Sequence, residues 1–387
     1  MARTHVVVIG GGYSGTLAAN HLRVRPDIDV TLVNPRPAFV ERIRLHQYAA
    51  GTRAATVDYG TLLGEGIRLV VDTAQRIDTA HRRILLASGG ELTYDYLIYA
   101  AGSTGTVPST VPGAAEFGYP IAELEYAERL RDVLDELHPD APVTVVGGGL
   151  TGIETASEFA GKGRAVTLAC GGLLGPSLSR AGRRSVAKAL GRLGVDLRES
   201  AVVAEVRPDA VLLADGTVLD TAVTVWTAGF GFPDLAAASG LATDPLGRLL
   251  TDETLTSVDN PWIVAAGDAA APSGQPLRMS CQAALPLGVQ AANTVLSRVD
   301  GTEPAALNQA FVGQCISLGR KYGTVQAARL DDTPVNAFVG GRLAAAIKEA
   351  VCRGTVWAIR REAAKPGSYR WLKGGTRPAP AEREAMV

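Results

Sequence analysis

Two features are missing from the sequence: close pairs of cysteines and long apolar runs. The four cysteines, Cys170, Cys281, Cys315 and Cys352, are widely separated, so neither a redox-active dithiol nor a zinc cluster is indicated. No stretch reaches the roughly 18 consecutive apolar residues of a membrane-spanning helix, and the start contains no signal-peptide core. We therefore expect a cytoplasmic protein with reduced thiols.

An excess of charge of one sign is also absent. The 38 Lys and Arg residues nearly balance the 39 Asp and Glu residues, so the net charge of −1 gives no reason to expect a nucleic-acid partner. Hydrophobic residues make up 47% and charged residues 20% of the chain, which excludes a disordered or fibrous protein. At about 150 residues per domain, the 387 residues predict two or three domains.

Glycine, in contrast, is abundant: the chain has 44, and they cluster at particular turns. Near the N-terminus, the apolar run 6–9 predicts a strand that is buried on both faces. The glycine loop 10–15 follows it, and then come a predicted helix over 16–22 and a second strand over 30–33. This order of strand, glycine loop, helix and strand is typical of a dinucleotide-binding unit.

The same unit occurs a second time later in the chain. A strand is predicted over 143–146, a glycine loop over 147–152, a helix over 153–160 and a strand over 166–169. Because an internal repeat outweighs any single motif, we predict an α/β fold with two Rossmann-like dinucleotide-binding domains.

Both glycine loops follow the pattern G-x-G-x-x-G. This turn removes side chains where a pyrophosphate approaches the backbone, and it directs the N–H groups of the following helix at that anion. Two correctly placed copies predict two bound dinucleotides, and the simplest pair is a flavin that stays bound and a nicotinamide that exchanges. The glycines are Gly10, Gly12 and Gly15 in the first copy, and Gly147, Gly149 and Gly152 in the second.

Further motifs follow one another in a characteristic order over residues 5–295. They are the first glycine loop, the segment Tyr94–Ser103, the second loop with Glu154, Trp226–Gly229, Ala266–Ala269 and Gln282–Ala284. In this order they resemble the flavoproteins of the pyridine nucleotide-disulfide oxidoreductase superfamily, and most of all its type II NADH dehydrogenase branch.

The resemblance implies roles for particular residues. FAD is expected at the first glycine loop, and NADH or NADPH at the second. Glu154 and Gln282 are expected beside the reacting rings as catalytic residues. The cofactor-binding residues beyond the loop glycines are expected to be Asn34, Arg42, Gly102, Gly229, Gly267 and Asp268.

Three polar residues of the chain have a second interpretation. Asp268 also suits a helix N-cap. Glu154, taken as lying in the first turn of its helix, is equally explained as a carboxylate that the positive helix N-terminus favours. His46 either contacts the flavin or the substrate, or it is a satisfied structural residue.

The residues that usually bind the ribose of a dinucleotide are changed. A Rossmann unit places Asp or Glu about 20 residues after the glycine loop, at the end of the second strand. The first unit has Asn34 there, whose amide can still bond a hydroxyl, but the second has Cys170. NADH and NADPH therefore both stay open, as does a nicotinamide site that no longer works. The nearest arginines for a 2′-phosphate are Arg164, Arg180, Arg183 and Arg184.

Two motifs that define the electron acceptor in the superfamily are missing or incomplete. The cysteine pair of the disulfide-reducing members is absent, because segment 42–47 reads Arg-Ile-Arg-Leu-His-Gln, so neither disulfide reduction nor sulfide oxidation is expected. In quinone-reducing relatives a segment Ala-Gln-x-Ala-x-Gln-Gln lines the quinone slot. Here Gln282 is kept, whereas Pro286 and Leu287 replace the later glutamines. The resemblance thus favours a quinone-like acceptor on an incomplete motif.

The repeat also divides the chain into regions. We predict an FAD-binding domain from residues 1–112 and 241–310, an NAD(P)-binding domain from 113–240 and a cap or interface region from 311–387. Between Gly340 and Gly375 there are eight Lys or Arg residues and two Glu residues. A basic amphipathic helix of this kind either lies on an anionic membrane surface, here the inner face of the membrane, or is an ordinary helix with a solvated basic face. A homodimer interface is a further alternative.

These observations lead to three hypotheses on function. The first is an enzyme that passes hydride from NAD(P)H to bound FAD and then electrons to a small-molecule, quinone-like acceptor. The second is a flavoenzyme of specialised metabolism that acts on a specific small organic substrate. Cys170 and the incomplete glutamine motif are the observations that support this hypothesis. The third is a non-enzymatic, redox-sensing flavoprotein whose basic tail binds a partner or a surface.

Overall fold

The first part of the fold is built around a parallel sheet. The computed structural model describes residues 3–374 of the chain. In these residues, a five-stranded sheet has the order β21-β9-β1-β2-β5, and every neighbouring pair is parallel. Its strands are β1 (Thr4–Ile9), β2 (Ile28–Asn34), β5 (Arg68–Val71), β9 (Tyr96–Tyr99) and β21 (Ile263–Ala265). Because β21 comes from a late part of the chain, this unit is completed only after the second unit has been inserted.

Both faces of this sheet are covered. Side chains alternate along a strand, so Val6 and Val8 pack against the helices α1 (Tyr13–Leu22) and α8 (Cys281–Val299), whereas Val7 and Ile9 face the other side. There the sheet meets an antiparallel sheet of β6 (Ala74–Asp78), β7 (Arg83–Leu86) and β8 (Glu91–Thr93), and the short helix α7 (Leu235–Ala238).

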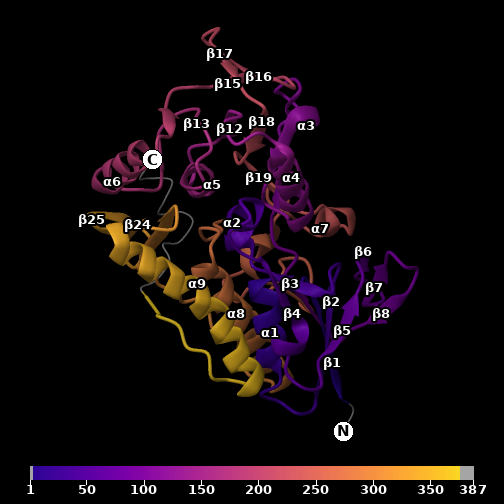
Figure 1. The fold of residues 1–387 in the computed structure, drawn as a ribbon. Coiled ribbons are helices and arrows are strands. Elements are labelled where there is room, and N and C mark those ends of the chain that lie inside the picture. The colour runs from indigo at the N-terminus through magenta and orange to yellow at the C-terminus, as the bar shows by residue number, and fades with distance from the viewer. Residues whose placement is uncertain (1–2, 375–387) are drawn as a thin grey trace, which may run out of the picture.

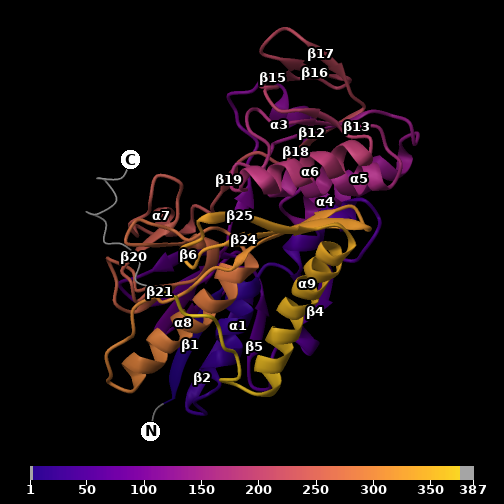
Figure 2. The same ribbon diagram turned by 90° about the vertical axis from the view of Figure 1, so that its left-hand side faces the viewer.

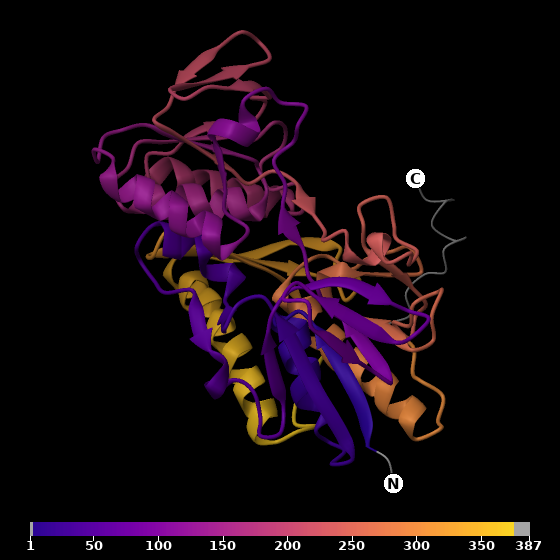
Figure 3. The same cartoon turned by 90° about the vertical axis from the view of Figure 1, so that its right-hand side faces the viewer.

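The second part repeats this arrangement. Its parallel sheet has the order β11-β18-β12-β13-β14 and lies above the first unit in Figure 1. The strands are β11 (Gly118–Pro120), β12 (Val143–Val146), β13 (Val166–Ala169), β14 (Asp196–Arg198) and β18 (Val223–Trp226). The helices are α3 (Ala114–Phe117), α4 (Leu124–Glu136), α5 (Leu150–Gly161) and α6 (Arg180–Arg192). An antiparallel sheet of β15 (Val203–Val206), β16 (Ala210–Leu213) and β17 (Val218–Asp220) lies at the outer end of this unit, at the top of Figure 3.

The two parallel sheets share the same order of their four other strands beside a different edge strand, β21 in the first and β11 in the second. The first strand of each unit, β1 or β12, lies between the strand that follows its helix and a later strand, which is β9 in the first unit and β18 in the second. The predicted α/β class with two Rossmann-like units is therefore confirmed. The two connections between the units pair with each other through β10 (Thr104–Gly105) and β19 (Phe230–Gly231). The predicted domain boundaries stay a prediction.

The C-terminal region forms a sheet and a long helix between the two units. The antiparallel strands are β23 (Gly313–Leu318), β24 (Tyr322–Ala328) and β25 (Pro334–Gly340), and the helix is α9 (Gly341–Ala364). Figure 2 shows β24 and β25 beneath α6, with α9 running down beside α1. The remaining elements are β3 (Ala38–Val40), α2 (Leu45–Ala49), β4 (Thr56–Asp58), β20 (Leu249–Thr251), β22 (Ala270–Pro272) and the 3₁₀ turns η1 (Arg42–Arg44), η2 (Tyr59–Thr61) and η3 (Gly267–Ala269).

A buried carboxylate fixes the end of α9 to the first unit. Glu362 is fully buried and accepts hydrogen bonds from His21 Nδ1 on α1 at 2.6 Å and from the backbone N–H groups of Gly367 and Tyr369. Because an unpaired buried carboxylate is costly, these bonds hold the chain reversal after α9 against α1. The part of the predicted C-terminal region beyond residue 374 lies outside the described residues.

The helices α1 and α8 cross closely at Gly288. A Cβ atom added there would lie 2.9 Å from the carbonyl carbon and the Cα of Ser14, which is closer than side chains pack. Ser14 lies within the first glycine loop, directly before Gly15, so this close crossing also sets the position of that loop. Gly354 on α9 is different, because a Cβ atom there would meet nothing within 4 Å.

We expect Gly288→Ala to lower the free energy of unfolding by about 1–3 kcal/mol, because the added methyl group pushes α1 away from α8. Gly354→Ala is the matched control, and it should raise stability by up to about 1 kcal/mol through helix propensity alone. Urea unfolding followed by circular dichroism measures both values. Equal effects of the two substitutions would contradict the close packing.

Candidate active site

The first glycine loop lies between β1 and α1. Gly10 has a φ of +100°, and a Cβ atom there would overlap the carbonyl oxygen of Ala100, so only glycine fits. A Cβ atom on Gly15 would overlap the carbonyl oxygen of Gly10 in the same way. Gly12 is open, since a Cβ atom there meets nothing within 4 Å. The first and third glycines thus make the turn, and the second leaves room for a ligand.

The second glycine loop, between β12 and α5, has the same division of roles. Gly147 has a φ of +121°, and a Cβ atom there would lie 2.6 Å from Thr227 Oγ1. Gly152 packs against the carbonyl oxygen of Gly147, whereas Gly149 faces open space. Both loops therefore fit a dinucleotide pyrophosphate, held by the backbone N–H groups at the start of α1 or α5.

The expected ribose positions are occupied by Asn34 in the first unit and by Cys170 in the second, and the two side chains behave differently. Asn34 ends β2, and its Oδ1 accepts a hydrogen bond from the Gly11 N–H at 2.9 Å while its Nδ2 donates to the carbonyl of Arg36 at 2.7 Å. The amide thus holds the first glycine loop in place. Cys170 follows β13, and burial raises the pKa of its thiol to about 11, so the thiol is protonated at neutral pH. Neither residue presents a carboxylate to a ribose.

Arg42, Ser103 and Asp268 come together from three distant segments. Ser103 Oγ donates to Asp268 Oδ2 at 2.8 Å, and Arg42 Nη1 donates to Ser103 Oγ at 2.9 Å. The Arg42 Nη1 atom also lies 3.9 Å from Asp268 Oδ2. This network holds the Asp268 carboxylate beside the turn that follows β9, where a flavin-binding role was predicted.

The N-cap interpretation of Asp268 is wrong. Asp268 lies inside the 3₁₀ turn Gly267–Ala269, which continues into strand β22 and not into a helix. The helix α8 begins later, at Cys281, and Ser280 caps it by accepting a hydrogen bond from the Ala283 N–H. Gly102, Gly229 and Gly267, which are expected to bind cofactor, have φ values of +71°, +89° and +71°, and their binding role stays a prediction.

Glu154 lies further along its helix than the sequence indicated. Because α5 begins at Leu150, Glu154 is beyond the first turn, and its carboxylate does not bind the helix N-terminus. Instead its Oε1 lies 2.9 Å from Lys348 Nζ on α9 and accepts a hydrogen bond from the Ser317 N–H on β23 at 2.8 Å. Burial would raise the pKa of Glu154, but Lys348, His46 and the Ser317 N–H outweigh it and lower the pKa. The carboxylate is therefore ionised.

Lys348 is the residue of this site that sequence reasoning missed. It lies in a helix whose basic residues alternate with apolar ones, so nothing in the pattern separates it from a solvated surface lysine. Burial would lower the pKa of Lys348, but Glu154 outweighs it and the pKa is raised. Its Nζ also donates to the carbonyl of Cys315 at 3.0 Å.

His46 lies on α2, facing the same cluster. It is buried, and burial lowers its pKa to about 4, with Lys348, Arg320 and Arg44 acting in the same direction and Glu154 opposing. The imidazole is therefore neutral at physiological pH. Its Nε2 has no hydrogen-bond partner among residues 3–374, so His46 has a polar atom left for a bound group.

Gln282 is engaged in packing. Its side-chain amide lies 3.1 Å from both the carbonyl oxygen of Gly313 and the Val312 N–H, and in the orientation that satisfies both atoms it bonds to each of them. The residues that replace the later glutamines, Pro286 and Leu287, are buried in α8. The catalytic role expected for Gln282 stays a prediction.

The cysteines are all free thiols. Cys281, Cys315 and Cys352 each interact electrostatically with Lys348, although they are widely separated in the sequence. Burial raises the pKa of all three, so they are protonated at neutral pH. Cys281 also contacts Tyr13, which follows the Gly12 position, so the cluster around Lys348 lies beside the first glycine loop.

The sequence over residues 4–288 matches the pyridine nucleotide-disulphide oxidoreductase family. The chain belongs to this family. The predicted cofactors of its two glycine loops, FAD together with NADH or NADPH, are thereby confirmed, while the choice between the two nicotinamides stays open.

Two curated relatives confirm the resemblance to the type II NADH dehydrogenase branch. A NADH dehydrogenase-like protein of Mycobacterium tuberculosis is 34% identical over 324 residues, which cover 76% of this chain and 80% of that protein. The type II NADH:quinone oxidoreductase of the same organism is 27% identical over 353 residues, covering 78% and 74%.

Solved structures share the fold. The sulfide:quinone oxidoreductase of Aquifex aeolicus superposes with a TM-score of 0.80 at 20% identity, over 94% of this chain and 93% of that one. NDH2 of Plasmodium falciparum in complex with NADH gives a TM-score of 0.74 at 16% identity, over 95% and 99%. At these identities the likeness shows the fold alone.

We expect Lys348→Met to lower the free energy of unfolding by about 3 kcal/mol, because it leaves the Glu154 carboxylate buried without its cation. In the double variant Glu154→Gln/Lys348→Met both charges are gone, so the loss should be smaller than the sum of the two single losses. Guanidinium unfolding of the four proteins completes the double-mutant cycle.

The control for this cycle is Arg353→Met on the same helix. Arg353 is paired with Glu349 but is 70% exposed, so its removal should cost less than about 1 kcal/mol. Additive losses for Glu154 and Lys348 would contradict a direct interaction between them.

Proposed function

We propose that this protein is an FAD-dependent NAD(P)H oxidoreductase that passes electrons to a quinone-like small molecule. The observation that carries the proposal is the pair of glycine loops, in each of which the second glycine faces open space while the first and third are closely packed. A single loop of this kind would fit one dinucleotide, and two provide for a bound flavin and an exchanging nicotinamide. Family membership supports this assignment.

A hollow beside Glu154 and Lys348 is the proposed approach for the acceptor. It has a volume of about 360 Å³ and lies between α2, the turn from β23 to β24, and α9. Ser317 and Lys348 line it, and both bond to Glu154. Its other charged lining residues are Arg320, Lys321, Arg342 and Glu349. The cations outnumber the single carboxylate, so the hollow favours an acceptor with oxygen atoms that become negative on reduction.

In this proposal a bound flavin would supply the redox chemistry between the nicotinamide and the acceptor. The Gly12 and Gly149 turns would hold the two pyrophosphates, and the network of Arg42, Ser103 and Asp268 would position the first cofactor. Lys348 holds its proton at Nζ and stabilises negative charge that develops on an acceptor oxygen. Glu154 keeps that lysine in place.

A second candidate function is the reduction or oxidation of a specific small organic substrate. The observation that favours it is the state of the glutamine motif: Gln282 is tied to residues 312 and 313, and the positions of the later glutamines are buried. A slot for a membrane quinone is therefore not built from these side chains. Redox sensing without turnover is the remaining alternative, and a rapid reaction with any acceptor excludes it.

We also propose that α9 rests on an anionic membrane surface. Leu343 and Trp357, at 64% and 59% exposure, lie two heptads apart on one face of the helix, and Arg353, Arg360 and Arg361 are exposed around them. Apolar side chains flanked by cations are what an interfacial helix presents to lipid. Among residues 3–374, no helix is long and apolar enough to cross a membrane. A cytoplasmic protein held at the inner face of the membrane is the location we propose.

The test of the redox function is anaerobic stopped-flow mixing of the flavin-loaded protein with NADH and, separately, with NADPH. We expect at least one donor to bleach the flavin absorbance near ~450 nm. A water-soluble quinone should then restore the absorbance at a rate no slower than steady-state turnover. If neither donor bleaches the flavin, the second glycine loop is not a working nicotinamide site and the proposed function fails.

The variant Cys170→Asp tests the ribose position of the nicotinamide. A carboxylate there accepts hydrogen bonds from the ribose diol and repels a 2′-phosphate, so we expect about tenfold tighter binding of NADH and weaker binding of NADPH. Cys170→Ser, which adds no charge, serves as the matched control. An unchanged preference in Cys170→Asp would place the ribose elsewhere.

Sedimentation with vesicles tests the membrane contact. We expect binding to vesicles of phosphatidylcholine with phosphatidylglycerol, and about tenfold weaker binding by Trp357→Asp, because an exposed aromatic side chain no longer enters the lipid. Leu246→Asp is the control, since Leu246 is 58% exposed but lies outside the C-terminal region. Equal weakening by both variants would show that α9 is not the contact.

A further inference from the structure

A second hollow lies between α6 and the C-terminal sheet, next to the hollow beside Lys348, with which it shares Tyr322. It has a volume of about 360 Å³. One wall is the helix α6, and the other is formed by β24, by Phe338 on β25 and by the start of α9. Its lining residues are Ala181, Arg184, Ser185, Lys188, Ala189, Arg192, Tyr322, Gly323, Phe338 and Gly341. We call it the α6 groove. No residue of either glycine loop, nor Cys170, lines it.

Hydrogen bonds fix the two walls of the α6 groove relative to each other. Gln326 on β24 is buried, and its Oε1 accepts a hydrogen bond from Ser179 Oγ at 2.7 Å. Ser185 Oγ lies 3.0 Å from Thr324 Oγ1, and the Ala181 N–H donates to Asn336 Oδ1. The groove is therefore a built junction between the second dinucleotide-binding unit and the C-terminal sheet.

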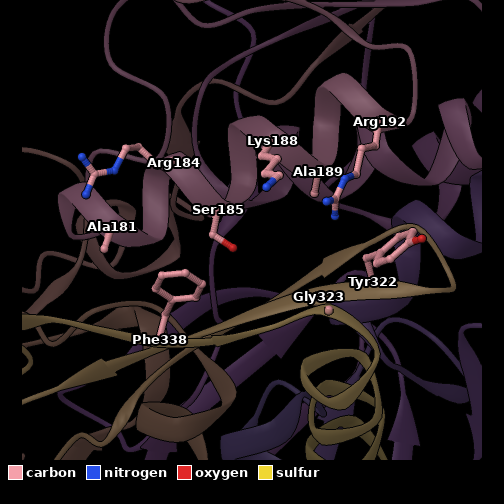
Figure 4. A pocket seen from close by; sticks show the side chains of 10 residues that line it. Ala181, Arg184, Ser185, Lys188, Ala189, Arg192, Tyr322, Gly323 and Phe338 are labelled. Atoms are coloured by element: carbon pink, nitrogen blue, oxygen red, sulfur yellow. The ribbon is translucent and has the colours of Figure 1, made fainter.

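The helix wall carries three cations in a row. Arg184, Lys188 and Arg192 follow one another at intervals of four residues, which places them on one side of α6 over about 12 Å. In Figure 4, the side chains of Lys188 and Arg192 extend toward the strands, and Arg184 lies at the far end of the row. Within residues 3–374, no hydrogen bond or ion pair is formed by these three side chains, and no acidic residue lines the groove.

The opposite wall provides ring surfaces. Tyr322 rises from the start of β24 below Arg192, and Phe338 on β25, at 42% exposure, lies below Ala181 and Ser185. Tyr322 is half-buried, so Phe338 is the more accessible ring. Accessible aromatic surface next to uncompensated cations offers both an apolar contact and charge to one ligand. Neighbouring cations without counter-ions repel one another, and a multiply charged anion relieves this repulsion.

From these observations we propose that the α6 groove binds the phosphate group of a small molecule, with Lys188 and Arg192 as the ligands of the phosphate. A phosphate carries up to two negative charges and accepts several hydrogen bonds, which suits a lysine ammonium and an arginine fork one helical turn apart. The ring surfaces of Tyr322 and Phe338 contact the remainder of the molecule. The phosphate belongs either to a free compound such as a nucleotide or to a lipid headgroup.

A ligand in the α6 groove joins two parts of the fold. Because it touches α6 on one side and β24 and β25 on the other, its binding stabilises the junction that also supports Ser317 and Lys348 on the neighbouring β23 and α9. The site does not depend on which acceptor receives the electrons. The proposal of a phosphate site can therefore be correct or wrong independently of the proposed redox function.

Isothermal titration calorimetry of the flavin-loaded full chain tests the proposal with three probes: inorganic pyrophosphate, ATP, and dihexanoyl phosphatidylglycerol as dissolved monomers. We expect at least one probe to bind, and its affinity to fall about tenfold or more in Lys188→Glu/Arg192→Glu, since each lost charged hydrogen bond contributes on the order of 1.5–3 kcal/mol. Any binding at the second glycine loop is unaffected by this variant and shows as a separate component.

The matched control is Arg68→Glu/Arg76→Glu, which changes the net charge by the same amount at two exposed arginines of the first unit. All variants should keep the flavin content and the circular dichroism spectrum of the wild type, because the four residues are exposed. A rise of the thermal unfolding midpoint with the bound probe is a second readout, absent from Lys188→Glu/Arg192→Glu.

The three probes distinguish the sources of the phosphate. Binding of pyrophosphate or ATP that depends on Lys188 and Arg192 supports the site with a free phosphate compound as its ligand. Binding of the lipid alone, with the same dependence, supports it with a headgroup as the ligand. The proposal is overturned if no probe binds, if the affinity is unchanged in Lys188→Glu/Arg192→Glu, or if both double variants lose it equally.

Discussion

The buried ion pair between Glu154 and Lys348 is the constraint on which the rest of this site depends. The side chains of Glu154 and Lys348 are only 11% and 14% exposed. A carboxylate and an ammonium that are largely removed from water are stable only as partners, with their remaining hydrogen bonds satisfied. Here the pair joins α5 of the second unit to α9 of the C-terminal region, and the Ser317 N–H on β23 completes the contacts of the carboxylate. His46, a neutral imidazole from the first unit, faces the same pair. Three regions of the chain must therefore assemble before the site exists.

The glycine loops impose a constraint of a different kind, on backbone space. At Gly10 and Gly147 the chain takes a positive φ, and at Gly15 and Gly152 the helix lies so close to the loop that no side chain fits. These contacts are internal to each unit, which is why the same glycine pattern forms the same turn in both units. The open position at Gly12 and Gly149 follows from the turn itself, and it is where the protein leaves room for a ligand.

The C-terminal sheet and α9 make the surroundings of the two repeated units different. Without them the molecule would be two similar dinucleotide-binding folds. The hollow beside Lys348 and the α6 groove both have one wall from a dinucleotide-binding unit and one from β23–β25 or α9. Residues that look alike in sequence, such as the basic ones of α6 and α9, thus take different roles. Lys348 is paired with Glu154 at the wall of a hollow, Lys188 lines the α6 groove without an acidic partner among residues 3–374, and Arg353 is exposed.

The sequence by itself determined the features that depend on neighbouring residues. Buried strands, the glycine turns and their repetition follow from local patterns, and from these the fold class, the family and the two cofactors could be predicted. Only the tertiary structure decided the rest. It moved Glu154 out of the first helical turn, removed the N-cap role of Asp268, tied Gln282 to the residues before β23, and made Lys348 a partner of Glu154. The physical reason is that a polar side chain takes its state from what surrounds it, and those surroundings come from other segments of the chain. For Glu154 and Asp268 these segments lie 163 and 165 residues away.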